Sequence, residues 1–569
     1  MRQCKDDVLS SAQDFWSASI QPRVSQIQHI ACAKYLAADA RRTLDDELRA
    51  MHLAMCSLRS CRNTLAPISR LPAEVLARVF QFYADVDPPG SHNDCPGQWM
   101  GWVHVMHVCR HWRNTGLTNS ALWTNINLTL GLRWAEQAMH LSKVAPLSID
   151  SWSLGPEKCG EVIAKHLSHT RRLDLSLTAE DLEKTMATLT PPAPILESIK
   201  FSSSNGLASL PNEVVDKHWN RLRHVLLTDV RMPWTSPIFC DLTHLHIEWP
   251  FLSSYSDDAA AVLRGRWDDM ALYDNFFGAL ERMPALEMLF LDRCLPLQLD
   301  GHRSGHSISL PHLKTLSLRD TSFRCGGIIK HLLIPPSCRL KFEFEWTSAA
   351  FSESPDVLNF LAVHIHGSTP LQLLSISIPE DSHNRLCYIN AWRRRPVDDK
   401  PPLVEKADLS FSFRSPWGRI DPLDDLCRGM PLNQLRVLHV ACDHCPPVWT
   451  SLAWVDMFKQ CQALEHVYIA GGSTEVFCQA FGMPMDDPDA FERETWTTHQ
   501  ICAEQVFLPS LKLLELERVR FDLGTEWHGG GRFNFELHDM LPKWLARRKN
   551  VKGIPTISIK NSRIQQNWI

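Results

Sequence analysis

Hydrophobic and polar residues alternate with two periodicities along this chain, a helical one near the start and one typical of strands further on. Residues 1–22 are expected to be weakly structured, whereas residues 24–65 contain neither proline nor glycine and predict one long helix or two short ones. Alternating steps of four and three residues mark an apolar stripe, in which Arg62 fills one place: Leu44, Leu48, Met51, Met55, Leu58 and Leu65. Such a stripe lies on one helix face. It is shorter than a coiled coil requires, so it is expected either to pack against the next domain or to mediate dimerisation.

Three short amphipathic helices are predicted between residues 68 and 124. Pro72 suits the first turn of the first helix and Glu74 complements its dipole, and one face carries Val75, Leu76, Val79, Phe80 and Tyr83. Residues 85–101 are rich in Pro, Gly, Asp and Asn and predict a loop. A second helix is expected over 102–114, closed by Gly116, with one face formed by Val105, Val108, Cys109 and Trp112, and a third carries Ala121, Leu122 and Trp123. Helices this short bury little apolar surface alone, so a partner or neighbour should cover them.

The order of three sequence pieces carries a resemblance to a known family. They are Leu71-Pro72-x-Glu74-Val75-Leu76-x-x-Val79-Phe80, then Val108-Cys109-Arg110-x-Trp112-Arg113, then Leu122-Trp123. Together they resemble an F-box. The match is closest to a fungal F-box-like family in which a helical lead-in ends in a Pro-Ile-x-x-Leu-Pro run, here Pro67 to Pro72.

The resemblance implies a role in protein recognition. An F-box inserts its helices into a Skp-type adaptor, which bridges to a cullin-RING scaffold, and the F-box protein chooses the substrate of the resulting ubiquitin ligase. The matching positions are apolar residues that a partner must cover: Leu71, Pro72, Leu76, Val79, Phe80, Val108, Trp112, Leu122 and Trp123. For Val75, Val105 and Cys109, packing within the domain is the favoured interpretation.

Beyond residue 130 the pattern Leu-x-x-Leu-x-Leu recurs, with Ile, Val or Phe allowed at its apolar places. Nine copies begin at Leu196, Leu222, Leu242, Leu286, Leu313, Leu371, Leu435, Leu464 and Leu511, with weaker relatives at residues 172–177 and 340–345. The shorter intervals between copies are typical of a leucine-rich repeat, in which each unit contributes a strand and a helix. Stacked units share a continuous core, which predicts a solenoid of parallel strands and helices.

In each copy, the residue between the last two apolar places should point away from the core. Together these outward residues predict a target-binding face. The candidates are His246, Phe290, Ser317, Ser375, His439, Tyr468 and Glu515. The Asn or Cys expected after each strand occurs only at Cys294, which leaves the regular curvature of the repeats open. Two inserts, at residues 388–403 and 483–496, are expected to form exposed loops.

Bulk composition restricts the classes of partner. Over 569 residues the net charge is only −5, which argues against binding to nucleic acids or membranes through charge. No apolar run approaches the roughly 20 residues that span a bilayer, and residues 1–16 lack an apolar signal core. The 18 cysteines show no framework spacing. Reduced thiols and a cytoplasmic or nuclear location are therefore expected.

Two groups of potential metal ligands are set aside. His104, His107 and His111 share one face of the second predicted helix, but the solvated flank of a helix is the favoured interpretation. The cluster His439, Cys442, His444 and Cys445 contains a single Cys-x-x-Cys, which is a weak signal for zinc. No phosphate-binding loop, dinucleotide fingerprint or nucleophile elbow is present in the sequence. We therefore expect no metal, no cofactor and no catalysis.

The predicted organisation is an α/β chain with four parts. They are a helical lead-in over 1–67, an F-box over 68–130, an irregular leucine-rich-repeat-like solenoid over 131–550 and a tail over 551–569. The predicted function is that of the substrate-recognition subunit of a Skp–cullin–F-box ubiquitin ligase, which docks an adaptor and holds a protein target. The alternative is a non-catalytic interaction scaffold with a vestigial F-box, outside ubiquitin transfer.

Overall fold

The computed structural model describes twelve uninterrupted stretches and most of a thirteenth near the C-terminus. They are residues 3–31, 37–92, 95–152, 159–249, 273–296, 307–345, 355–379, 386–397, 399–414, 426–442, 451–482, 507–519, and 541–561 apart from 543–544, 547 and 550–552. The chain divides into two compact units, Met1–Leu147 and Ser148–Ile569. No helix within the described stretches is both long and apolar enough to cross a membrane.

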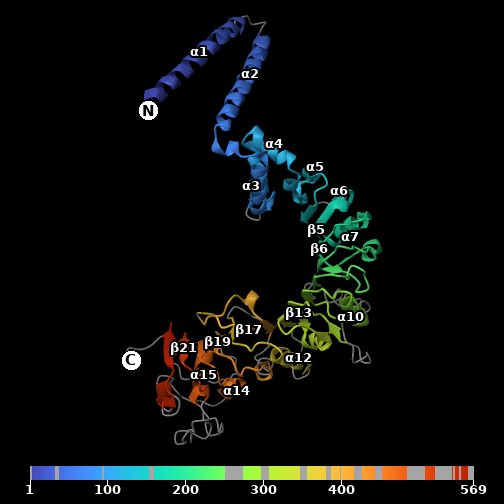
Figure 1. Ribbon diagram of the computed structural model, residues 1–569, viewed down its shortest axis with the longest axis vertical. Coiled ribbons are helices and arrows are strands. Elements are labelled where there is room, and N and C mark those ends of the chain that lie inside the picture. Colours follow the sequence, from blue (N-terminus) through green and yellow to red (C-terminus); the bar gives the residue numbers. More distant parts are fainter. Residues whose placement is uncertain are drawn as a thin grey trace. The chain divides into compact units, whose positions relative to one another are not determined.

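The first unit begins with two long helices, α1 (Gln3–Ala31) and α2 (Ala37–Thr64) (Figure 1). The expectation of weak structure over residues 1–22 is therefore wrong from Gln3 onward. The helix continues through Pro22, although that residue lacks an amide hydrogen to donate. Packing against α2 supports the end of α1, because Ile27 and Ala40 are buried there.

Short helical segments follow α2. They are η2 (Pro67–Arg70), α3 (Ala73–Val86), η3 (Gly101–His107), α4 (Arg110–Thr118), η4 (Ser120–Trp123), η5 (Leu128–Leu130) and α5 (Leu132–Ser142), with β3 (Asn125–Asn127) between η4 and η5. The expected loop at 85–101 contains an antiparallel hairpin, β1 (Gly90–His92) and β2 (Cys95–Trp99).

The single helix expected over 102–114 is interrupted. Cys109 adopts an extended backbone, with φ −159° and ψ 171°, which separates η3 from α4. Gly116 lies inside α4 rather than closing it. A Cβ at Gly116 would lie 2.9 Å from Met106 Sδ, so glycine lets η3 approach α4 closely.

One sheet runs through the second unit. Its strands are β4 (Leu147–Trp152), β5 (Thr170–Leu177), β6 (Ser198–Ser203), β8 (His224–Thr228), β10 (His244–Glu248), β11 (Met288–Asp292), β13 (Thr315–Thr321), β15 (Arg339–Glu345), β18 (Leu409–Arg414), β17 (Leu386–Trp392), β16 (Leu373–Ile378), β19 (Val437–Cys442), β20 (His466–Gly471), β21 (Leu513–Glu517) and β22 (Thr556–Lys560), in spatial order. The described pairings are parallel except those of β17 with β16 and β18. Short pairs β7 (Ala208–Ser209) with β9 (Val230–Arg231) and β12 (Ile308–Ser309) with β14 (Leu332–Leu333) stand outside this sheet.

The repeated motif accounts for the strands. All nine copies fall on parallel strands, and the register aligns equivalent positions, for example Val225, Leu245 and Leu289 across β8, β10 and β11. These three side chains are buried, so the apolar places of the motif form the core. The predicted α/β fold, with a helical start and a largely parallel sheet, is confirmed. Assignment of the units to the leucine-rich repeat family stays a prediction.

Helices lie along one side of the strands in this unit (Figure 1). They are α6 (Cys159–His166), α7 (Ala179–Thr188), α8 (Asn212–Val215), α10 (Tyr273–Glu281), α11 (Ser322–Ile329), α12 (Pro355–His366), α14 (Ser451–Phe458) and α15 (Ser473–Gly482). Thr178 and Thr321 cap α7 and α11 by accepting hydrogen bonds from the amides of Asp181 and Arg324.

Two expectations about the second unit are corrected. Residues 388–392 of the first predicted insert belong to β17, inside the sheet, because Cys387, Ile389 and Ala391 pack into the core. Part of the predicted tail forms β22, which extends the sheet beyond β21. The second insert, at 483–496, lies outside the described residues.

Candidate functional site

Helix α3 has two apolar faces, of which the unit itself covers one. Leu76 and Phe80 are buried, and the Phe80 ring lies 5.3 Å from that of Trp112, centre to centre. Pro72 precedes the helix, and its carbonyl accepts the first helical hydrogen bond, from the Leu76 amide at 3.0 Å. At the other end the Tyr83 hydroxyl donates to Asp87 at 2.9 Å, and that bond raises the pKa of the phenol.

The second face of α3 is exposed. At about 100° per residue, the spacing of Val75, Val79, Phe82 and Val86 places them in one stripe, turned away from the buried face. Their exposed fractions run from 46% to 82%. The Arg78 guanidinium lies 5.0 Å from the centre of the Phe82 ring, which makes a cation–π contact at the edge of this stripe. We call these four residues the α3 outer face.

Aromatic packing fixes the helices behind α3. The Trp123 ring lies 5.2 Å from that of Trp102 and 5.8 Å from that of Trp134, centre to centre. Its indole N–H donates to the Gly116 carbonyl at 2.8 Å, so the polar atom of this buried ring is satisfied. Trp123 therefore holds the helical domain together from inside.

The nine predicted adaptor-binding residues divide by exposure. Leu76, Phe80, Leu122 and Trp123 are buried, Leu71 and Trp112 are half-buried, and Pro72, Val79 and Val108 are exposed. Val75, expected to pack inside, is exposed, whereas Val105 and Cys109 are half-buried. Sequence reasoning missed Phe82 and Val86, although their spacing from Val75, at i+7 and i+11, signals a shared helix face.

The histidines of this region do not share one helix face. His104 and His107 lie in η3, whereas His111 follows the break at Cys109. In the second unit, His439 and Cys442 lie on β19, while His444 and Cys445 fall outside the described residues. In the stretches that the structure describes, no three His, Cys, Asp or Glu side chains gather as a metal site would require.

The second candidate surface is the outward side of the sheet. Strand register places all seven predicted target-binding residues in one row across it, and we call this row the sheet outer row: His246, Phe290, Ser317, Ser375, His439, Tyr468 and Glu515. Ser317 and Ser375 are buried and the other five are half-buried. The sequence positions that the motif aligns thus share one register, with Lys341, Ser410 and Asn390 between Ser317 and Ser375.

Two ring pairs stand out in the sheet outer row, one tilted (His246 with Phe290) and one stacked (His439 with Tyr468). The rings of His246 and Phe290 lie 3.9 Å apart, and those of His439 and Tyr468 lie 4.1 Å apart, centre to centre. The Tyr468 hydroxyl donates to Glu517 at 2.5 Å. Burial, reinforced by the nearby charge of His466, lowers the pKa of His439 to about 4. Both pairs offer flat aromatic surfaces at neutral pH, with the His439 imidazole uncharged.

Between these two ring pairs, the strands carry polar residues at the same register. Asn390 of β17 pairs with Ser375 of β16 and Ser410 of β18. Its side-chain oxygen is buried and accepts no hydrogen bond from any described residue. A buried acceptor without a donor is costly, so this oxygen lowers the stability of the sheet at this point.

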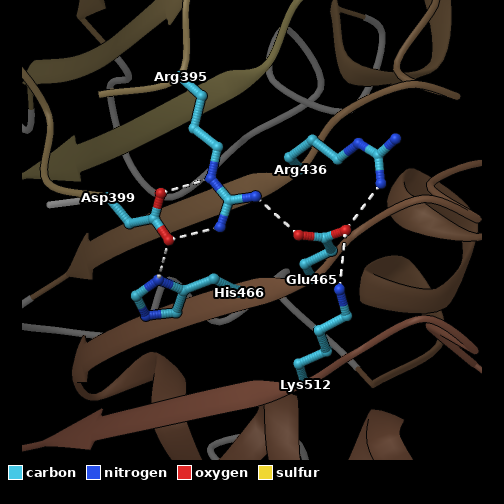
Figure 2. A network of polar contacts seen from close by, with 6 residues as sticks. All are labelled: Arg395, Asp399, Arg436, Glu465, His466 and Lys512. Carbon is cyan, nitrogen blue, oxygen red and sulfur yellow. Dashed lines mark hydrogen bonds and ion pairs between the residues drawn. The ribbon is translucent and has the colours of Figure 1, made fainter. Parts of the chain in front are cut away.

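An ionic network lies at the end of the sheet where its parallel strands begin (Figure 2). Glu465 accepts hydrogen bonds from Arg395 at 2.7 Å and Arg436 at 2.8 Å, and Lys512 lies 3.2 Å away. Arg395 also makes two bonds to Asp399, at 2.6 and 2.7 Å. Arg395, and to a lesser extent Lys512, hold the pKa of the Glu465 carboxyl below its usual range. The network ties the segment after β17 to three parallel strands, which is a structural role.

Comparison with known proteins bears on the first unit. An F-box-like family model matches residues 68–129, the stretch that carries α3 and the aromatic packing behind it. No curated protein matches the chain. F-box domains generally bind Skp-type adaptors, which agrees with an apolar helix face left open in the isolated chain. This chain therefore contains an F-box-like domain at residues 68–129.

Proposed function

We propose that this protein is a non-catalytic substrate receptor of a Skp–cullin–F-box ubiquitin ligase. The α3 outer face is the observation that carries the proposal: four large apolar side chains on an F-box helix, which the unit leaves exposed. Exposed apolar stripes of this kind mark protein interfaces. Val108, directly after η3, is a further exposed apolar residue of the domain.

The mechanism is positioning. The adaptor covers the α3 outer face, and the sheet outer row holds a protein target through its aromatic pairs. Holding both on one chain raises the effective concentration of target lysines near the ubiquitin carrier. A cytoplasmic or nuclear location, expected from the cysteine pattern of the sequence, suits this role.

Adaptor docking is tested by placing charge on the α3 outer face. The double variant Val79→Glu, Phe82→Glu should lose co-purification with a Skp-type adaptor, because two carboxylates would be buried without partners. Val144→Glu is the control, since Val144 is also a large exposed apolar residue of the same unit, with 87% of its surface accessible, but lies after α5. Undiminished adaptor capture by the double variant would contradict docking through this face.

Ligase membership is a separate question from adaptor docking. Affinity purification of the full chain with the proteasome blocked should bring down the adaptor, the cullin and a ubiquitinated target together. Phe290→Ala should reduce recovery of the target while adaptor recovery stays unchanged, because it removes one aromatic pair from the sheet outer row. Capture of the adaptor without the cullin would instead indicate a scaffold outside ubiquitin transfer.

A further inference from the structure

The apolar stripe of α2 is open to solvent along its whole length. Five large side chains of α2, and Leu65 directly after its last residue, have exposed fractions between 37% and 77%: Leu44, Leu48, Met51, Met55, Leu58 and Leu65. Neither the F-box-like domain nor α1 covers them. Helix α1 reaches only one flank, where Arg23 pairs with Glu47 at 2.8 Å. A continuous apolar stripe on a helix calls for a partner.

Charge on the free flank indicates which partner fits. Asp45 and Arg59 each follow a stripe residue by one position and are separated by two heptads, so they lie on the same side of the stripe and at opposite ends. In an antiparallel pair of α2 helices centred near residue 53, Asp45 of each copy faces Arg59 of the other. The two-fold axis therefore creates two attractive pairs from one sequence.

The same antiparallel arrangement covers the apolar stripe. Leu48 packs against Leu58 of the second copy, and Met51 packs against Met55 of the second copy. Arg62 packs its stem on Leu44 of the second copy and extends its charge towards the neighbouring Asp45. In a parallel pair, by contrast, Arg62 of one chain would lie opposite Arg62 of the other. Asp45 would then face Ala40 of the other chain, and no ion pair would form.

We propose that two copies of this chain associate through α2 as an antiparallel helical pair. Each copy buries the other's stripe, and α1 remains on the flank that carries Glu47. The dimer presents two F-box-like domains and two sheet outer rows in one particle. Its formation does not depend on the adaptor, so it can be tested without the proposed ligase function.

The experiment measures the mass of the purified full chain by sedimentation over a range of concentrations. The expected mass is twice the 64.9 kDa of one chain. Leu48→Glu should give a monomer, because it places two carboxylates in the apolar seam. Leu53→Glu is a matched control, since Leu53 is equally exposed, at 59%, but lies on the opposite side of the helix, and this variant should stay dimeric.

Charge reversal then tests the orientation. Asp45→Arg or Arg59→Asp alone should raise the dimer dissociation constant roughly tenfold, because each converts two attractive pairs into repulsive ones. The double variant Asp45→Arg, Arg59→Asp should return it to within about threefold of the wild-type value. The proposal is overturned by a monomeric wild-type chain at every concentration, by equal effects of Leu48→Glu and Leu53→Glu, or by a double variant that shows no rescue.

Discussion

Two phenylalanines on one helix provide the sharpest test of the α3 assignment. Phe80 and Phe82 are two residues apart in α3, yet the side chain of Phe80 is 2% exposed and that of Phe82 is 62% exposed. The same substitution to alanine should therefore have opposite consequences at the two positions. Phe80→Ala should destabilise the domain, and Phe82→Ala should impair adaptor binding.

The magnitudes separate the two variants clearly. Truncating a buried phenylalanine costs about 3–5 kcal/mol, a large share of the roughly 5–15 kcal/mol that stabilises a typical domain. Phe82→Ala loses its cation–π contact with Arg78, worth about 0.5–1 kcal/mol. It gains about 0.5 kcal/mol of helix propensity, so the net change in stability should be near zero. Truncating an interface anchor, in contrast, costs at least about 2 kcal/mol of binding, or roughly thirtyfold in affinity.

Amide hydrogen exchange of the full chain, followed by mass spectrometry, measures the first effect locally. Peptides from α3 and α4 should lose protection in Phe80→Ala and keep it in Phe82→Ala. Titration with purified adaptor measures the second effect. Equal loss of protection in both variants would refute the two-faced description of α3, and normal adaptor affinity of Phe82→Ala would refute its role as an anchor.

Three further perturbations follow from local geometry. Gly101→Ala should speed amide exchange in α3, because φ is +51° and the new Cβ would lie 2.5 Å from the Asp87 carbonyl oxygen, a strain of at least about 1–2 kcal/mol. Glu465→Gln should lower the urea midpoint of the second unit at low salt by the equivalent of about 1 kcal/mol or less, and the effect should fade in molar salt, because the ionic network is partly exposed. His439→Gln should flatten the pH dependence of that midpoint. The folded chain keeps this imidazole neutral down to about pH 4, whereas the unfolded chain protonates it near 6.5, so wild-type stability falls as the pH drops between these values.

The strands were predictable because burial imposes a strict spacing on them. Each copy of the motif marks a parallel strand, and the outward positions align as expected. Two strands that the motif search missed also carry it, at Val144-x-x-Leu147-x-Ile149 before β4 and Ile554-x-x-Ile557-x-Ile559 on β22. β18 has Lys406 where the first apolar residue should stand, so spacing alone could not find it.

β17 was unpredictable for a different reason. Its neighbours β16 and β18 belong to a parallel sheet, and an antiparallel strand between them obeys no repeat period. The partner of a strand is set by contacts distant in the sequence, and a local pattern does not contain them. Arg395, which follows β17, finds its partner Glu465 in the same way, across seventy residues.

The F-box-like domain shows what the spacing of apolar residues cannot determine. An apolar residue at helical spacing is equally suited to the core of its own domain and to the surface of a partner, so Phe80 and Phe82 look alike in sequence. Only the position of Trp112 decides that Phe80 is inside. Leu76, Ala77 and Ala84 share the covered side of α3 with Phe80, whereas the α3 outer face lies on the opposite side of the helix. The same logic applies to α2, where no described contact covers the stripe. Exposed apolar faces on successive helices are thus the most informative feature of this unit, and each can be tested independently of the other.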